Sequence, residues 1–366
     1  MIRALNPFGM KIQLTKNKTI ELGGGAKRAP TDVVGIELDY ENPKGCPAVR
    51  LVSRRKGWSL VAAGYVPPPP ERMPASWEEM KERRAHWSLP PAFQAPVAAI
   101  AVNAPGAVAR ETSLDGIRSE LGDAKLEISP NVPFSKDGRR FVISDLADEG
   151  FVLQSELPEC QTLWLGRLFP EGRRPTVGSV QVASVARLGA MAQQPEFLAA
   201  EGSGMCMFVS RNAVHFAGWH EGRLALFRQC PGASGWGPIR EAVKARLSLD
   251  ESLVDGVLEG TMVDPGFILE PFVKPVFREL TLSIDYLTRR KNVRCDWVYL
   301  LGLPSGGGFW NQIAESSARL SFIVPHAFDG LEIAGKKGAV PELTSSDSQM
   351  FFGALGAARA LMEEQP

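Results

Sequence analysis

The turn over residues 42–45, Asn-Pro-Lys-Gly, is the first place where this sequence could bind a phosphate. On both sides of it, at 34–38 and at 49–51, apolar residues alternate with others, as they do in half-buried strands. Proline has no N–H to donate and glycine tolerates a positive φ, so the turn interrupts the ladder and makes a hairpin. The backbone N–H groups of such a turn can face an anion. The sequence therefore predicts a strand-turn-strand unit whose turn could face a phosphate.

The other residues that could do chemistry lack the spacing that their chemistry needs. His215 and His220 lie five residues apart in an alternating segment, so they point to opposite faces and make a poor metal pair. The glycines at 23–25 are followed by no GK[ST] motif and are interpreted as a linker. Ser305 begins a Ser-Gly-Gly-Gly run, which is not the GxSxG elbow of hydrolases.

Composition indicates an ordinary globular protein of 366 residues, long enough for about two domains. Its 41 basic and 41 acidic residues cancel, so no overall charge attracts it to nucleic acid or to a membrane. The five cysteines show no CxxC spacing, which favours reduced thiols in the cytoplasm. No window approaches the about 20 apolar residues of a spanning helix, and the N-terminal apolar run is too short for a signal peptide.

Two three-strand meanders should position the candidate turn. The first covers residues 33–66, with turns at 42–45 and 56–57, and the second covers 205–227. They form a weak internal repeat. An almost wholly apolar run at 96–104 indicates a strand buried on both faces.

Further elements follow from the same patterns. A capping box at 76–79 opens a helix to about residue 86. The remaining predictions are helices at 114–124, 187–200, 238–247 and 266–291, and strands at 140–146, 163–169 and 176–185.

Four segments in consistent order resemble the PilM and FtsA branch of the actin-like ATPases. They are GIELDYENPK at 35–44, RELTLSIDY at 278–286, the strand, glycine loop and helix at 297–323, and the closing helix MFFGALGAARALM at 350–362. The resemblance implies an α/β, duplicated ribonuclease H-like fold with an inserted subdomain. In that fold one hairpin from each half clasps the phosphates of ATP.

The resemblance also implies a division of the chain. An N-terminal extension occupies 1–31, the first subdomain 32–96 and 176–202, and the inserted subdomain 97–175. The second half occupies 203–362, with its smaller subdomain at about 230–280.

The resemblance also places a nucleotide site, without establishing whether ATP or ADP binds. Its candidate cofactor-binding residues are Lys44, Glu279, Gly302, Ser305, Gly306 and Gly307. Three departures weaken it: Asp39 stands where a glycine approaches phosphate, Phe208 where the second acid belongs, and Ser210 where the second glycine belongs. Phenylalanine can neither hold Mg²⁺ through water nor orient the attacking water. We therefore expect no catalytic residues, no metal site and no hydrolysis.

By resemblance, the chain is a cytoplasmic scaffold of a type IV pilus or type II secretion platform. It would be held at the inner membrane by the cytoplasmic tail of a PilN-like protein, which in relatives lies in a groove between the first and inserted subdomains, and would contact other platform proteins. The alternative is an active ATP-binding or ATP-hydrolysing member of the actin and sugar-kinase superfamily. A third interpretation, an FtsA-like filament protein, calls for a C-terminal amphipathic membrane helix.

Overall fold

The structure is a computed structural model that describes most of residues 30–363. The described residues are 30–40, 42, 44–55, 57–83, 86–103, 106–121, 134–145, 151–170, 172, 174–194, 204–210, 213–220, 223–230, 235–258, 262, 266–292, 295, 297–302, 321–335 and 338–363. The predicted N-terminal extension lies almost wholly outside them.

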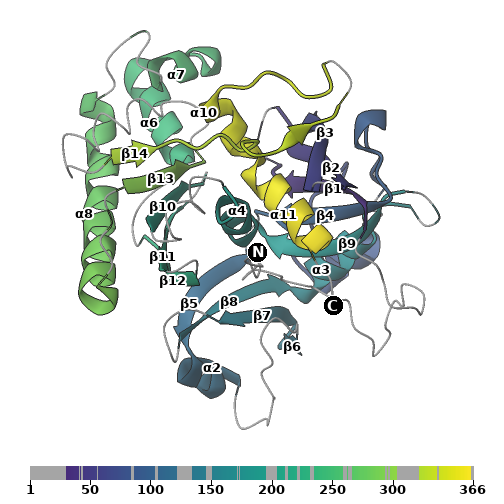
Figure 1. The fold of residues 1–366 in the computed structure, drawn as a ribbon, viewed down its shortest axis with the longest axis horizontal. Coiled ribbons are helices and arrows are strands. Elements are labelled where there is room, and N and C mark those ends of the chain that lie inside the picture. Colours follow the sequence, from purple (N-terminus) through teal and green to yellow (C-terminus); the bar gives the residue numbers. More distant parts are fainter. Residues whose placement is uncertain are drawn as a thin grey trace.

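A six-stranded sheet forms the first half of the molecule (Figure 1). Its strands are β1 (Asp32–Leu38), β2 (Cys46–Arg54), β3 (Gly57–Val66), β4 (Val97–Val102), β9 (Thr176–Val182) and β15 (Glu332–Ile333). The first three pair antiparallel, and β4 and β9 continue the sheet in parallel from β1. The first predicted meander and the doubly buried strand β4 are therefore confirmed.

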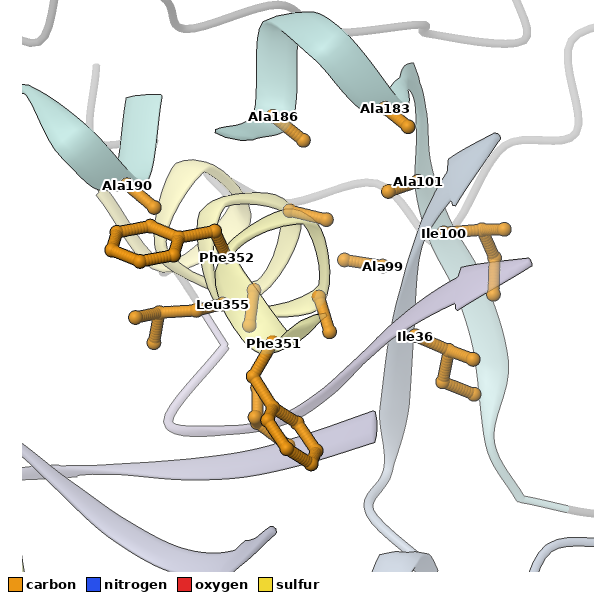
Figure 2. Close-up of a cluster of buried hydrophobic side chains, with 14 of the residues drawn as sticks. Ile36, Ala99, Ile100, Ala101, Ala183, Ala186, Ala190, Phe351, Phe352 and Leu355 are labelled. Carbon is orange, nitrogen blue, oxygen red and sulfur yellow. The ribbon is translucent and has the colours of Figure 1, made fainter. Parts of the chain in front are cut away.

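Helices α4 (Ala183–Met191) and α11 (Phe352–Glu363) cover one face of this sheet. The two helices approach closely because small residues line their contact: a Cβ on Gly356 would lie 1.7 Å from the carbonyl oxygen of Ala186. Figure 2 shows Ala186 and Ala190 of α4 pointing toward α11. Likewise, a Cβ on Gly35 of β1 would lie 2.0 Å from the carbonyl oxygen of Ala354. The layers therefore pack at backbone distance.

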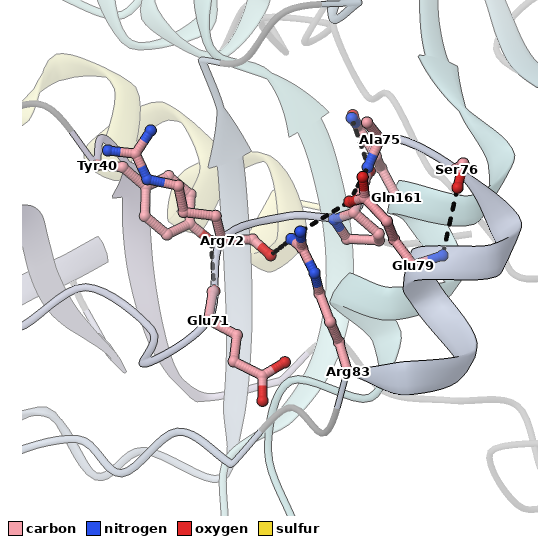
Figure 3. A network of polar contacts seen from close by, with 9 residues as sticks. Tyr40, Glu71, Arg72, Ala75, Ser76, Glu79, Arg83 and Gln161 are labelled. Carbon is pink, nitrogen blue, oxygen red and sulfur yellow. Dashed lines mark hydrogen bonds and ion pairs between the residues drawn. The ribbon is translucent and has the colours of Figure 1, made fainter.

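The segment between β3 and β4 carries few regular elements. It contains α1 (Trp77–Glu82) and the 3₁₀ turn η1 (Pro91–Phe93). Ser76 caps α1, since the Glu79 N–H donates to its hydroxyl at 3.3 Å, which confirms the predicted start. Hydrogen bonds from outside this segment hold it in place, as Figure 3 shows. The Tyr40 hydroxyl donates to the carbonyl of Glu71 at 3.4 Å, and the Gln161 side chain donates to the carbonyl of Pro74 at 3.2 Å.

A five-stranded sheet forms the second half with the same strand order as the first. Its strands are β10 (Gly204–Val209), β11 (Val214–His220), β12 (Arg223–Gln229), β13 (Trp297–Leu301) and β14 (Ser321–Ile323). Three in a meander are again followed by two in parallel, so the order β12-β11-β10-β13-β14 repeats β3-β2-β1-β4-β9. Helices α6 (Trp236–Leu247), α7 (Glu251–Leu258) and α8 (Gly266–Lys291) pack on this half, and the long helix predicted at 266–291 is confirmed. The internal repeat is therefore a duplicated fold.

A four-stranded antiparallel sheet is inserted between β4 and β9. It contains β5 (Val108–Ser113), β6 (Phe134–Lys136), β7 (Arg139–Asp145) and β8 (Phe151–Pro158), with α2 (Leu114–Leu121) after β5. We call this sheet with α2 the inserted lobe. Strand β4 itself lies in the six-stranded sheet between β1 and β9. The subdomain boundaries drawn from the sequence, including the one at 97, stay a prediction.

The predicted strand at 163–169 is wrong, because that region is helix α3 (Glu159–Gly166) followed by a short turn. The helix is buried at Cys160, Gln161, Thr162, Trp164 and Leu165, so it shows no polar face and no helical period. The chain ends with α10 (Ser345–Ser348), the 3₁₀ turn η2 (Gln349–Phe351) and α11. In the part of the chain that the structure describes, no helix has the length and apolar character needed to cross a bilayer.

Candidate nucleotide site between the two halves

The inner face of the second sheet packs directly on the first half. Along β10, Cys206 and Phe208 join the hydrophobic core that also contains α4 and α11, while Met205 and Met207 join the core on the outer side. Strands β11 and β13 sort their side chains in the same alternating way, as the pleat of a strand requires. An apolar seam therefore joins the halves. Its members from the second half are Cys206, Phe208, Ala217, Trp219, Leu224, Phe227, Tyr299 and Leu301.

A buried ion pair occupies the carboxyl end of β1. Glu37 is 1% exposed and Arg187 of α4 is 7% exposed. The Arg187 Nε donates to Glu37 Oε2 at 3.3 Å, and its Nη2 also donates to Oε1. A Cβ on Gly353 of α11 would lie 1.9 Å from Oε2, so the carboxylate fills the available space. Burial raises the pKa of Glu37 above its usual 4.5, although Arg187 pulls the pKa down.

The first turn uses its own amides internally. The Lys44 N–H donates to the Asn42 side chain at 3.0 Å, and the Gly45 N–H donates to the Asn42 carbonyl at 3.0 Å. The Lys44 ammonium lies 5.9 Å from the Tyr65 ring, outside the turn's hydrogen bonds. Asp39 is buried, and its carbonyl accepts the Cys46 thiol. The amides of Lys44 and Gly45 are therefore not directed at an anion.

The second turn, after β10, is closed in the same way. The Ser210 N–H donates to the Ala213 carbonyl at 2.8 Å, and the Ala213 N–H donates to the Ser210 hydroxyl at 3.0 Å. The Ser210 carbonyl accepts from the Trp236 N–H at 3.0 Å. Phe208, where the resemblance to the family places the second acid, is 1% exposed inside the apolar seam. A metal-bound phosphate would have to displace this packing.

Gly302 has a structural reason to be glycine. Its φ is +86°, and a Cβ there would lie 2.2 Å from the carbonyl oxygen of Val209 at the end of β10. The Gly302 N–H donates to Gln349 Oε1 at 3.1 Å, and Gln349 donates in turn to Pro325 at 2.5 Å. Close approach of two strand ends therefore explains Gly302 without a ligand.

Of the other predicted nucleotide residues, Glu279 lies among those that the structure describes. Glu279 of α8 forms an ion pair with Arg228 of β12, which occupies the carboxylate predicted to reach a ribose. Ser305, Gly306 and Gly307 lie outside the described residues. The candidate site residues as a set stay a prediction.

His215 lies in the same seam, next to the ion pair. Its ring stacks on Phe227 with centroids 5.6 Å apart. Burial, together with the nearby positive charge of Arg187, lowers the pKa of His215 to about 4, so the ring is neutral at physiological pH. All five cysteines are buried free thiols. Within the described residues, no three His, Cys, Asp or Glu side chains are placed to hold a metal ion.

Comparison with known proteins gives matches among structures only. No family model matches the chain, and no curated protein matches it. A solved PilM-PilN type IV pilus biogenesis complex is similar with a TM-score of 0.60 at 15% identity, over 90% of this chain and 98% of that chain. The chain has an actin-like ATPase fold.

Two further solved structures are less similar. An archaeal actin homologue, Ta0583, has a TM-score of 0.38 at 15% identity, over 91% of this chain and 100% of that chain. The cytoplasmic domain of EpsL, an inner-membrane component of the type II secretion system of Vibrio cholerae, has a TM-score of 0.28 at 10% identity, over 60% of this chain and 75% of that chain.

Arg187, which pairs with Glu37 at the end of β1, was not predicted from the sequence. Arg187 is the one charged residue in the α4 stretch ASVARLGAM, which is otherwise small and apolar. A lone arginine in such a helix signals a buried ion pair. Its partner, 150 residues away, carries no local signal.

Proposed function

We propose that this protein is a PilM-like scaffold of a type IV pilus or type II secretion platform, and that it works without nucleotide. It would act in the cytoplasm and bind the N-terminal cytoplasmic tail of a PilN-like membrane protein. The similarity in fold over 90% of the chain to PilM in a PilM-PilN complex supports the assignment.

The buried Glu37–Arg187 pair is the observation that carries the proposal. In this fold the end of β1 faces the phosphates, and here an internal guanidinium neutralises the carboxylate there. A nucleotide bringing Mg²⁺ would have to compete with a pair already taken out of water, in which both hydrogen bonds are made. The self-bonded turns and the apolar seam around Phe208 act in the same direction. A scaffold that needs no nucleotide fits these contacts better than an ATPase does.

The junction between the inserted lobe, α3 and β9 is the place we propose for the tail. These elements contact one another, and in Figure 1 they lie on the same side of the molecule. Among the described residues, five buried side chains of this junction have a polar atom without a hydrogen-bond partner. They are Gln154 (Oε1), Ser155 (Oγ), Gln161 (Oε1), Trp164 (Nε1) and Ser179 (Oγ).

Buried polar atoms are normally paired, so a concentration of unpaired ones suits a site that receives a partner. Once the junction opens and exposes these buried atoms, an extended peptide can supply the missing donors and acceptors from its backbone, and a few side-chain pockets add specificity. The same chemistry explains why a tail of about a dozen residues would bind here without any charge complementarity.

Calorimetry with the N-terminal peptide of the neighbouring PilN-like protein tests the proposal. We expect binding at micromolar strength, about −8 kcal/mol, that is unchanged by ATP and Mg²⁺. Trp164→Phe keeps the ring and removes only the indole donor, so it should weaken binding by about fivefold, the worth of one hydrogen bond. Trp236→Phe, on α6 of the second half, is the matched control and should not. Absence of heat with the wild-type chain, or heat only in the presence of ATP, would favour a nucleotide-switched enzyme.

A further inference from the structure

The inserted lobe contacts the second half through two sheet edges. Strand β5 is an edge of the four-stranded sheet and β12 is an edge of the five-stranded sheet. The two strands contact each other and run close together in Figure 1, yet they share no ladder among the described strands. Instead, the side chain of Glu111 on β5 accepts a hydrogen bond from the Phe227 N–H of β12 at 2.9 Å.

The β12 end of this bond is rigid. The Phe227 side chain is fully buried, stacks on His215 and belongs to the apolar seam that joins the halves. A backbone amide on such a residue cannot move without disturbing both halves. The hydrogen bond between Glu111 and Phe227 therefore depends on where the inserted lobe lies relative to the second half.

The other end of the lobe is its root, where β5 begins and β8 ends and where lobe residues such as Leu157 share the core of the first half. Gly106 adopts a φ of +90°, with Pro158 so near that a Cβ would lie 3.2 Å from its ring. Arg139 donates to the Gly106 carbonyl at 2.9 Å and pairs with Glu156 at 3.1 Å, so the root is closed within the lobe. Rotation about this root would carry β5 away from β12 without breaking a ladder in any of the three sheets.

We propose that Glu111 is a latch that fixes the inserted lobe against the second half and so sets the geometry of the tail-binding junction on β8, α3 and β9. A carboxylate accepting an amide is a charge-assisted bond, which makes one contact strong enough to bias the lobe. Because it is a side-chain bond between two sheet edges and not part of a ladder, it can open while every sheet stays intact. The latch itself is independent of the proposed function, whereas its effect on tail binding rests on it.

Hydrogen exchange and calorimetry on the full chain test the latch. Glu111→Ala should make the β12 amide at Phe227 exchange about tenfold faster or more, and should change the affinity for the PilN-like tail peptide by at least threefold. Glu111→Gln keeps an acceptor oxygen and should restore most of both. Arg110→Ala, at the exposed neighbouring position of β5, is the matched control and should change neither.

Each outcome decides a different step. Unchanged exchange at Phe227 in Glu111→Ala would overturn the latch, because packing alone would then hold the lobe. Faster exchange with unchanged tail affinity would overturn the link to the junction. If the wild-type chain binds no tail peptide, the proposed function fails while the exchange measurement still decides the latch. Circular dichroism shows whether Glu111→Ala keeps the wild-type fold. If it does not, the exchange rates of Glu111→Gln decide. A latch predicts that in this variant only the Phe227 amide exchanges faster than in the wild type, at a rate below that of the unfolded chain.

Discussion

Replacing Arg187 with methionine tests whether the end of β1 depends on an internal cation. The change keeps a long side chain between α4 and β1 and removes the charge that Glu37 needs. Breaking a buried pair from one side costs about 3–5 kcal/mol, because the remaining charge is left uncompensated. The side chains of Arg187 and Glu37 are only 9% and 2% exposed, so little solvent screening reduces this figure. We expect a loss of this size in the free energy of unfolding from urea titrations at neutral pH.

The stability lost in Arg187→Met should depend on pH. Burial already raises the pKa of Glu37, and loss of Arg187 removes the main opposing cause, so the carboxyl in the variant takes up a proton at higher pH. A raised folded-state pKa contributes stability that is present below the unfolded value of about 4.5 and is lost as pH rises through the folded value. The deficit of Arg187→Met should therefore be smaller at about pH 5 than at about pH 7.

Two controls make the measurement specific. Arg50→Met breaks the ion pair with Asp32, whose side chains are 22% and 23% exposed, and should cost about 1 kcal/mol or less. Adding Glu37→Gln to Arg187→Met removes the stranded charge and should recover most of the stability. A cost for Arg187→Met no larger than for Arg50→Met, or no recovery in the double variant, would refute the reasoning.

Three further predictions concern residues in or beside the shared core. Because the folded pKa of His215 is about 4 and its ordinary value 6.5, stability should fall by up to about 3 kcal/mol as pH drops through that window, and His215→Phe should remove this loss in denaturant titrations at each pH. Phe208→Ala should lower the free energy of unfolding by about 3–5 kcal/mol. Phe208→Asp, which introduces the acid of the family, should also destabilise the protein without releasing phosphate from ATP faster than buffer does. ATP turnover by the wild type or by Phe208→Asp would contradict an apolar seam. Arg359 is 4% exposed, and its Nε and Nη1 have no hydrogen-bond partner among the residues that the structure describes. Arg359→Met should therefore raise the melting temperature and increase the unfolding free energy by about 1 kcal/mol. A loss of stability would mean that its contact with the Trp58 ring outweighs burial of the charge.

The sequence alone determined the local units and their order. Alternation of apolar residues predicted both meanders, because a strand with one buried face must place apolar side chains at every second position. Helical periodicity predicted α8, and the Ser76 capping box predicted the start of α1. Each of these signals lies within a few residues of chain. The actin-like fold itself was implied by the resemblance of four motifs, in consistent order, to a known family.

Tertiary structure alone decided which groups meet, because no local pattern records a contact between distant segments. Glu37 and Arg187 pair across 150 residues, and Glu111 reaches Phe227 across 116. Gly302 is explained by the Val209 carbonyl on another strand. The sequence of α3 shows no helical period because α1, β7, β8 and β9 contact the helix and bury most of it. The same apolar residues therefore suit a strand or a helix until the packing is known.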